Sequence, residues 1–122
     1  MVLGVLQGDV KEVQKLLSMK NIDVNEPEKK SGNVALHYAS AKGHLEVVRA
    51  LLSDPRTDPN RENHHNTTPL ILAAGNANAE VLEELLSSTK TNPNFEVCAL
   101  LHQRHIRHLR HRCNHKNYQN WN

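Results

Sequence analysis

The chain has 122 residues, enough for one domain, and because aromatic residues make up only 3%, its core must be built from leucine, valine and alanine. All 13 acidic residues and ten of the 15 lysines and arginines lie at or before Glu96, so a mildly acidic body carries a basic end. Two cysteines exclude a disulfide framework, and without a signal peptide or a membrane span we expect an intracellular protein, cytoplasmic or nuclear.

The stretch from Val34 to Asn60 recurs along the chain. A shift of 34 residues aligns it with a second copy, and a shift back by 35 aligns it with a partial one. The matched residues include Leu36 with Leu70, Ala39 with Ala73, Leu51 with Leu85, Gly43 with Gly8, and Leu51 with Leu16. Repetition at this period is typical of short units that stack, because one such unit cannot bury its apolar face alone.

The first copy, residues 1–33, is predicted to contain a short helix from Val2 to Gln7 and a second helix after a turn at Gly8. Asp9 is the expected N-cap of that second helix. Apolar residues at helical spacing predict its buried face, and these are Val10, Val13, Leu16 and Leu17. The polar stretch Asn25 to Asn33 is predicted to be an exposed loop.

The second copy, residues 34–67, is the most regular one. Helices are predicted from Val34 to Lys42 and from Leu45 to Ser53, joined by a glycine turn and stopped before Pro55. Their contact residues are predicted to be Leu36, Ala39 and Ser40 in the first helix, and Val47, Val48, Leu51 and Leu52 in the second. A second polar loop, Arg61 to Thr67, follows.

The third copy, residues 68–96, opens on Thr68, the expected N-cap, with Pro69 in the first helical turn. Small and aliphatic residues predict its packing surface, namely Ala73, Ala74, Val81, Leu82, Leu85 and Leu86. Gly75, Asn76 and Asn78 have poor helix propensity, so we expect this copy to be looser than the second.

Two short motifs connect the copies to a known family. They are Val34-Ala35-Leu36-His37-Tyr38-Ala39, matched by Thr68-Pro69-Leu70-Ile71-Leu72-Ala73, and Asp23-Val24-Asn25, matched by Asp58-Pro59-Asn60 and Asn92-Pro93-Asn94. The pattern resembles the ankyrin repeat over roughly Gly4 to Asn94. The resemblance implies an all-α ankyrin-repeat solenoid of about three helix-turn-helix repeats with projecting loops, covering residues 1–96. It also implies that the His37 ring holds neighbouring loops together, a role that Ile71 cannot take. Neither end supplies an obvious polar cap, so we expect marginal stability.

The resemblance further implies a non-enzymatic module that binds an unidentified protein partner on its concave face and loop tips. We expect a monomer without a cofactor. Tyr38 and Leu72 are the expected apolar anchors, because apolar residues at the centre of a patch dominate binding. The full set of candidate partner-binding residues is Glu28, Lys29, Lys30, Tyr38, Lys42, Arg61, Glu62, His64, His65, Leu72 and Asn76. The sequence offers no matched nucleophile, base and acid, so no catalytic residue is predicted.

Residues 97–122 form a basic, histidine-rich tail with five lysines and arginines and no acid. The sequence allows several interpretations of this tail. It could form a capping helix from Val97 to Arg112, or it could be a product of alternative splicing or of a shifted reading frame. It could also bind nucleic acid, acidic surfaces or metal, with the repeats as scaffold. The three-residue spacing of its histidines spreads them around a helix, so we predict no metal site. Only two aromatic residues accompany the cations, which does not favour nucleic acid. The repeats could also be a structural segment of a longer array.

Overall fold

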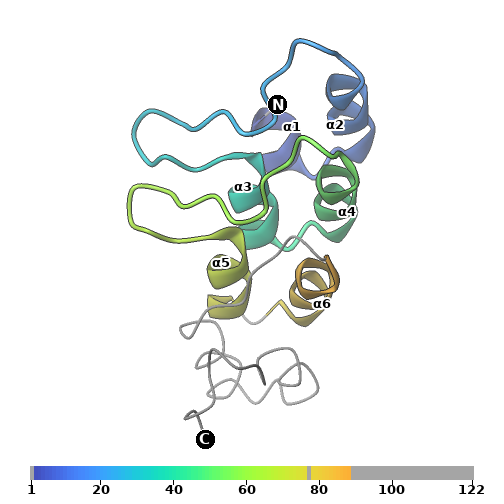
Figure 1. Cartoon of the computed structure of the whole chain (residues 1–122). Coiled ribbons are helices and arrows are strands. Elements are labelled where there is room, and N and C mark those ends of the chain that lie inside the picture. Colours follow the sequence, from blue (N-terminus) through green and yellow to red (C-terminus); the bar gives the residue numbers. More distant parts are fainter. Residues whose placement is uncertain (1, 77, 89–122) are drawn as a thin grey trace, which may run out of the picture.

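The computed structural model describes residues 2–76 and 78–88, and this part of the chain is helical without strands (Figure 1). The helices are α1 (Val2–Gln7), α2 (Val10–Leu17), α3 (Ala35–Lys42), α4 (Leu45–Ser53), α5 (Pro69–Gly75) and α6 (Ala79–Ser87). They form three antiparallel pairs stacked one on the next, which confirms the predicted all-α solenoid. The tail, with its predicted helix from Val97 to Arg112, lies outside the described residues.

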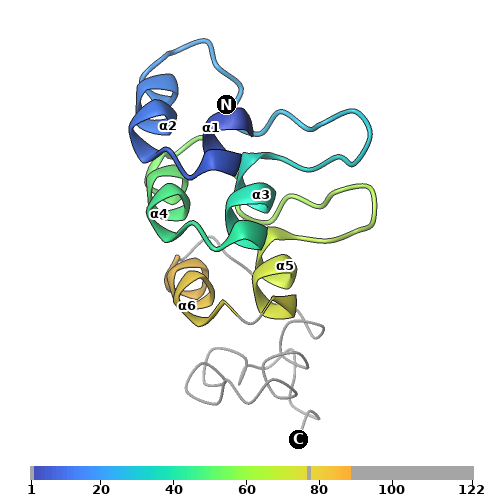
Figure 2. The same ribbon diagram turned by 180° about the vertical axis from the view of Figure 1, so that it is seen from behind.

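The helices form two layers, with α1, α3 and α5 in one and α2, α4 and α6 in the other (Figures 1 and 2). Within each layer the middle helix contacts both neighbours, because α3 packs on α1 and α5 while α4 packs on α2 and α6. Two long loops, residues 18–34 and 54–68, project beside α1, α3 and α5, away from the other layer (Figure 2). We call α1, α3, α5 and these loops the inner face.

Side-chain caps fix where two of the helices begin. The Asp9 carboxylate accepts a hydrogen bond from the Glu12 backbone N–H at 3.2 Å, and the Thr68 hydroxyl accepts one from the Ile71 N–H at 3.3 Å. Each bond satisfies a donor that the first helical turn leaves without an intrahelical partner. Both predicted N-caps are therefore confirmed, and Pro69 lies in the first turn as expected.

One continuous core runs between the two layers, and it consists of leucine, valine, isoleucine and alanine. Leu51 and Leu85 occupy equivalent positions in α4 and α6, and both are fully buried. All the predicted contact residues of α3, α5 and α6 are buried as well, whereas Leu52 in α4 is half-buried. The repeat-to-repeat register derived from the sequence is therefore confirmed for the second and third copies.

The first repeat differs from this expectation. Of its predicted stripe only Val13 is fully buried, whereas Val10, Leu16 and Leu17 are half-buried. The physical reason is that, among the described helices, α2 has a stacking neighbour on one side only, namely α4. The exposed Glu12 stands where the shift of 35 residues places the buried Val47, so a charged side chain covers part of this face.

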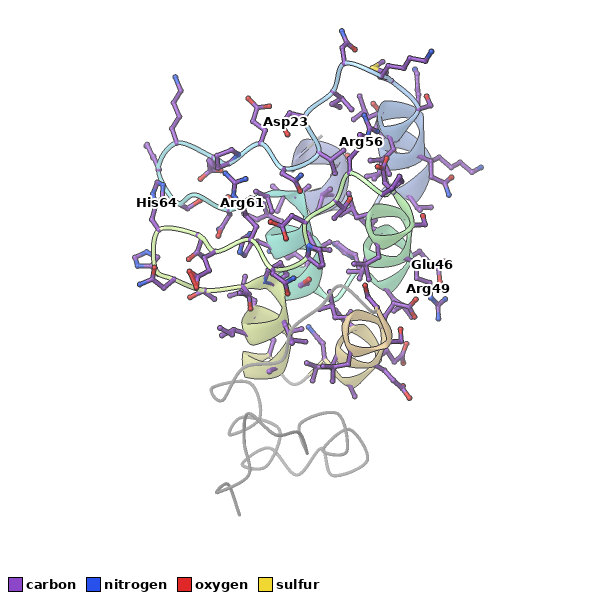
Figure 3. The ribbon with its side chains drawn as sticks, viewed as in Figure 1. Asp23, Glu46, Arg49, Arg56, Arg61 and His64 are labelled. Carbon is purple, nitrogen blue, oxygen red and sulfur yellow. The ribbon has the colours of Figure 1, made fainter. Side chains whose placement is uncertain are left out.

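A side chain that the sequence did not single out joins the first two repeats. The Arg56 guanidinium donates to the backbone carbonyls of Leu17 at 2.7 Å and Met19 at 3.1 Å, and it pairs with Asp54 at 2.8 Å (Figure 3). The carbonyls at a helix C-terminus lack intrahelical donors. Arg56 therefore supplies, from the loop after α4, donors that the end of α2 needs.

Candidate protein-binding face

The two projecting loops are hydrogen-bonded to each other. The His64 backbone N–H donates to the Ser31 carbonyl at 2.9 Å, and the His64 ring Nδ1 donates to the Lys30 carbonyl at 3.1 Å. The Asn63 side-chain amide donates to the Asn33 side-chain oxygen at 2.7 Å. Figure 3 shows His64 near the outer end of the loops and Arg61 closer to the helices. The loop tips are therefore one connected surface.

Gly32 makes this close approach possible. Its φ is +74°, in the left-handed region that side chains disfavour, and a Cβ added there would lie 2.5 Å from the His64 ring. The first loop is also closed on itself, because the Gly32 N–H donates to the Glu28 carbonyl at 2.7 Å. Any larger residue at this position would push the two loops apart.

His37 ties the second loop to the start of α3. Its ring is fully buried, with Nδ1 accepting from the Val34 N–H at 3.0 Å and Nε2 donating to the Thr67 carbonyl at 2.7 Å. Burial lowers the pKa of His37, and the hydrogen bond to Thr67 acts against that shift to a smaller extent. The neutral ring has one donor and one acceptor, which is what the two contacts require. The role of His37 as a loop tie is confirmed.

Tyr38 ties the first loop to the middle of α3. Its hydroxyl donates to Glu28 Oε2 at 2.7 Å, and the Ser31 hydroxyl donates to Glu28 Oε1 at 3.0 Å. These two bonds favour the ionised carboxylate and hold the pKa of Glu28 below its usual value. The tip of the first loop is therefore anchored on the inner helix layer at the residue expected to be an apolar anchor.

The structure places the other candidate residues in two groups. The loop-tip residues Lys29, Lys30, Arg61, Glu62, His64 and His65 are all exposed. Lys42 and Asn76 are also exposed but lie at the far ends of α3 and α5 from the loops, and the Asn76 amide donates to the Ala41 carbonyl at 3.1 Å. Tyr38 and Leu72 are half-buried at equivalent positions of α3 and α5. The structure thus brings the loop tips and Tyr38 together and sets Lys42, Leu72 and Asn76 further along the same face.

Leu6 in α1 belongs to this face and was not among the candidates. It is exposed at 37%, and the shift of 35 residues aligns it with Ala41, a half-buried residue of α3 that adjoins the candidate Lys42. Its backbone carbonyl contacts the His44 ring Nε2 at 3.2 Å, so α1 is held against the turn of the next repeat. The repeat alignment was the signal that could have found it.

Comparison with known proteins agrees with the geometry. A family model described as ankyrin repeats (3 copies) matches residues 1–97. The chain belongs to the ankyrin-repeat family. Ankyrin repeats are generally protein–protein interaction modules, and an ankyrin stack is non-enzymatic as a rule.

Two curated ankyrin-containing proteins share sequence with the chain. It is 39% identical over 61 residues to the nuclear factor NF-kappa-B p105 subunit of Gallus gallus, which covers 50% of this chain and 6% of that protein. It is 38% identical over 73 residues to the 2-5A-dependent ribonuclease of Mus musculus, which covers 60% of this chain and 10% of that protein. The chain thus corresponds to a small part of either relative.

A solved structure shares the ankyrin fold. A chain in the crystal structure of the yeast ribosomal protein Rps3 in complex with its chaperone Yar1 superposes with a TM-score of 0.73. The superposition covers 90% of this chain and 85% of that chain at 19% sequence identity. At this identity the likeness concerns the arrangement of the helices.

Residues 2–76 and 78–88 hold no group of three or more histidine, cysteine, aspartate or glutamate side chains placed to bind a metal ion. Within the same residues, no helix has the length and apolar character needed to cross a membrane. The histidines and cysteines of residues 97–122 lie outside the described residues.

Proposed function

We propose that the inner face of this ankyrin stack binds a protein partner by equilibrium recognition, without chemistry. The observation that carries the proposal is a set of hydrogen bonds. His64 joins the two loop tips to each other, Tyr38 joins Glu28 of the first tip to α3, and His37 joins the end of the second loop to α3. Ordering flexible loops at an interface costs free energy, and loops already held in place avoid most of that cost. The loop tips are therefore suited to present charged side chains in a fixed arrangement.

The chemistry of the face supports the same proposal. Half-buried Tyr38 and Leu72, together with exposed Leu6, provide apolar surface on three successive inner helices. Charged and polar residues of the loop tips surround one edge of it. Protein interfaces commonly combine an apolar centre with a polar rim, and a few apolar or aromatic anchors carry most of the binding free energy. An intracellular site of action, cytoplasmic or nuclear, is part of the proposal.

The test begins with partner capture on the intact chain, followed by titration of each captured partner against variants. The double variant Tyr38→Ala, Leu72→Ala should bind at least about tenfold more weakly, a loss of about 1.4 kcal/mol. The matched control is Lys11→Ala, Lys15→Ala on the exposed surface of α2, which should bind as the parent does. Thermal melts of both double variants show whether the stack is intact. A partner that binds the first variant with full affinity would remove the assignment to the inner face.

A second candidate function rests on the tail, whose five lysines and arginines stand without any acid. Such a segment could bind nucleic acid or another acidic polymer, with the ankyrin repeats as scaffold. Deleting residues 97–122 distinguishes the two functions. It should abolish binding of an acidic polymer such as heparin and leave an inner-face partner bound.

A further inference from the structure

A groove lies on the outer layer, between α4 and α6, on the side of the stack away from the loops. It has a volume of about 270 Å³ and is lined by Leu45, Arg49, Glu80, Glu83, Glu84 and Ser87. Leu45 is half-buried and packs against the core, so the groove has an apolar base. Figure 3 shows Arg49 and the neighbouring Glu46 on the outer side of α4.

The groove carries more carboxylates than its one arginine can neutralise. Arg49 forms ion pairs with Glu46 at 2.8 Å and with Glu84 at 3.2 Å, so its charge is neutralised by these two glutamates. Glu80 and Glu83 are exposed and form no ion pair with any residue of the described part of the chain. The outer surface of α6 therefore carries two carboxylates that no cation of residues 2–76 and 78–88 neutralises.

The chain itself contains a segment of the opposite charge. Residues 97–122 include no acid and carry cations at Arg104, Arg107, Arg110, Arg112 and Lys116, with apolar Ile106 and Leu109 between them. The helix that bears the glutamates ends at Ser87, so only residues 88–96 separate it from this segment. Nine residues reach up to about 30 Å, more than twice the roughly 13 Å length of α6. The segment can therefore turn back along the helix that it follows.

We propose that residues 97–122 dock on the α4–α6 groove of the same molecule, with arginines pairing with Glu80 and Glu83. Arginine can donate two parallel N–H···O hydrogen bonds to one carboxylate. In a network of several cations and carboxylates, each ion pair costs less side-chain entropy than an isolated pair does. Because a short linker attaches the tail to α6, the effective concentration of the tail at the groove is in the millimolar range. Ion pairs that are individually weak are then enough to keep the tail bound. The groove lies on the opposite layer from the inner face, so this contact is independent of the proposed partner binding. It would also compete with acidic polymers for the tail.

A nitroxide on the tail tests the contact in the full chain. Cys98→Ser leaves Cys113 as the single labelling site, since the chain has two cysteines. The label should broaden the amide NMR signals of α6 and of the first turn of α4, and the broadening should be lost in Glu80→Gln, Glu83→Gln. It should also be lost in about 0.5 M NaCl, where exposed charges more than a few ångström apart are screened.

The matched control is Glu26→Gln, Glu62→Gln, which removes two exposed carboxylates from the loops and should leave the broadening unchanged. Thermal melts check that both variants keep the fold. The proposal is overturned if α6 is not broadened, or if the Glu80 and Glu83 changes have no more effect than the control. It is also overturned if broadening appears on unlabelled, ¹⁵N-enriched chains mixed with labelled ones, because the occupant is then a second copy.

Discussion

The Tyr38 hydroxyl and the Glu28 carboxylate meet at 2.7 Å, and this contact joins the middle of α3 to the tip of the first loop. Ser31 donates to the other oxygen of the same carboxylate at 3.0 Å. Both oxygens of Glu28 are thus held by neutral donors, one from a helix and one from the loop itself. The geometry of this loop tip depends on an exposed carboxylate that remains ionised.

Tyr38→Phe should raise the pKa of Glu28 toward its ordinary value, because the larger of the two stabilising hydrogen bonds is removed. The lowered pKa in the parent means that the contact contributes stability at neutral pH and loses it as the pH falls through the folded-state pKa. A carboxyl ¹³C NMR titration measures the shift. Ser31→Ala should give a smaller change, and an unaltered Glu28 titration in Tyr38→Phe would contradict the assigned hydrogen bond.

The buried His37 should make the stack sensitive to acid. The pKa of His37 is lower in the folded protein than in the unfolded chain, where it is about 6.5. As the pH falls, the unfolded chain therefore takes up the proton at a higher pH than the folded protein does. The free energy of unfolding decreases as the pH drops below about 6.5. The loss is at most about 1.4 kcal/mol per pH unit from this one group. Urea unfolding at several pH values measures it. His37→Ala should be less stable at neutral pH yet lose less on acidification; an equal acid loss in both proteins would argue against this role.

Leu51→Ala should lower the free energy of unfolding by about 2–5 kcal/mol, because Leu51 is fully buried where the second repeat meets its neighbours. Leu52→Ala is the matched control, since it removes the same atoms from the adjacent, half-buried position. Denaturant unfolding of both variants gives the comparison. If both substitutions lower the free energy of unfolding by the same amount, the assignment of Leu51 to the buried side of the repeat is wrong.

Two glycines should respond in opposite directions to the same added methyl group. Gly43 has a φ of +73°, and its Cβ would lie 3.2 Å from the Asn78 amide, so Gly43→Ala should cost about 1–2 kcal/mol. Gly75 ends α5 with an ordinary φ, and no atom of the described residues lies within 4 Å of an added Cβ, so Gly75→Ala should stabilise the protein by about 0.4–1 kcal/mol. Thermal melts measure both, and a stabilising Gly43→Ala would be inconsistent with the turn.

The helices and their partners could be predicted because the sequence repeats. Leu51 and Leu85 recur in register, so one derived interface implied the next, and both are buried as expected. Asp9 and Thr68 cap through bonds that span three residues, which local sequence can reveal. These features depend on residues that are close in sequence, and the repeats present the same residue pattern more than once.

The ties between the loops could not be predicted in the same way. Arg56 reaches carbonyls of the previous repeat, and His64 reaches the Lys30 carbonyl, so the partners are backbone atoms more than 30 residues away. A sequence shows both side chains merely as polar loop residues. The partial exposure of Leu16 was likewise missed, because burial depends on which neighbours are present rather than on helical periodicity.

Hydrogen exchange with and without a captured partner locates the bound surface without altering any residue, so it is a direct test of binding at the inner face. If the partner binds the inner face, slowed exchange on binding is concentrated in the two loop tips, residues 28–32 and 61–66, and extends to α3 and α5. Protection confined to α2, α4 and α6, with the loop tips exchanging as in the free protein, would contradict it.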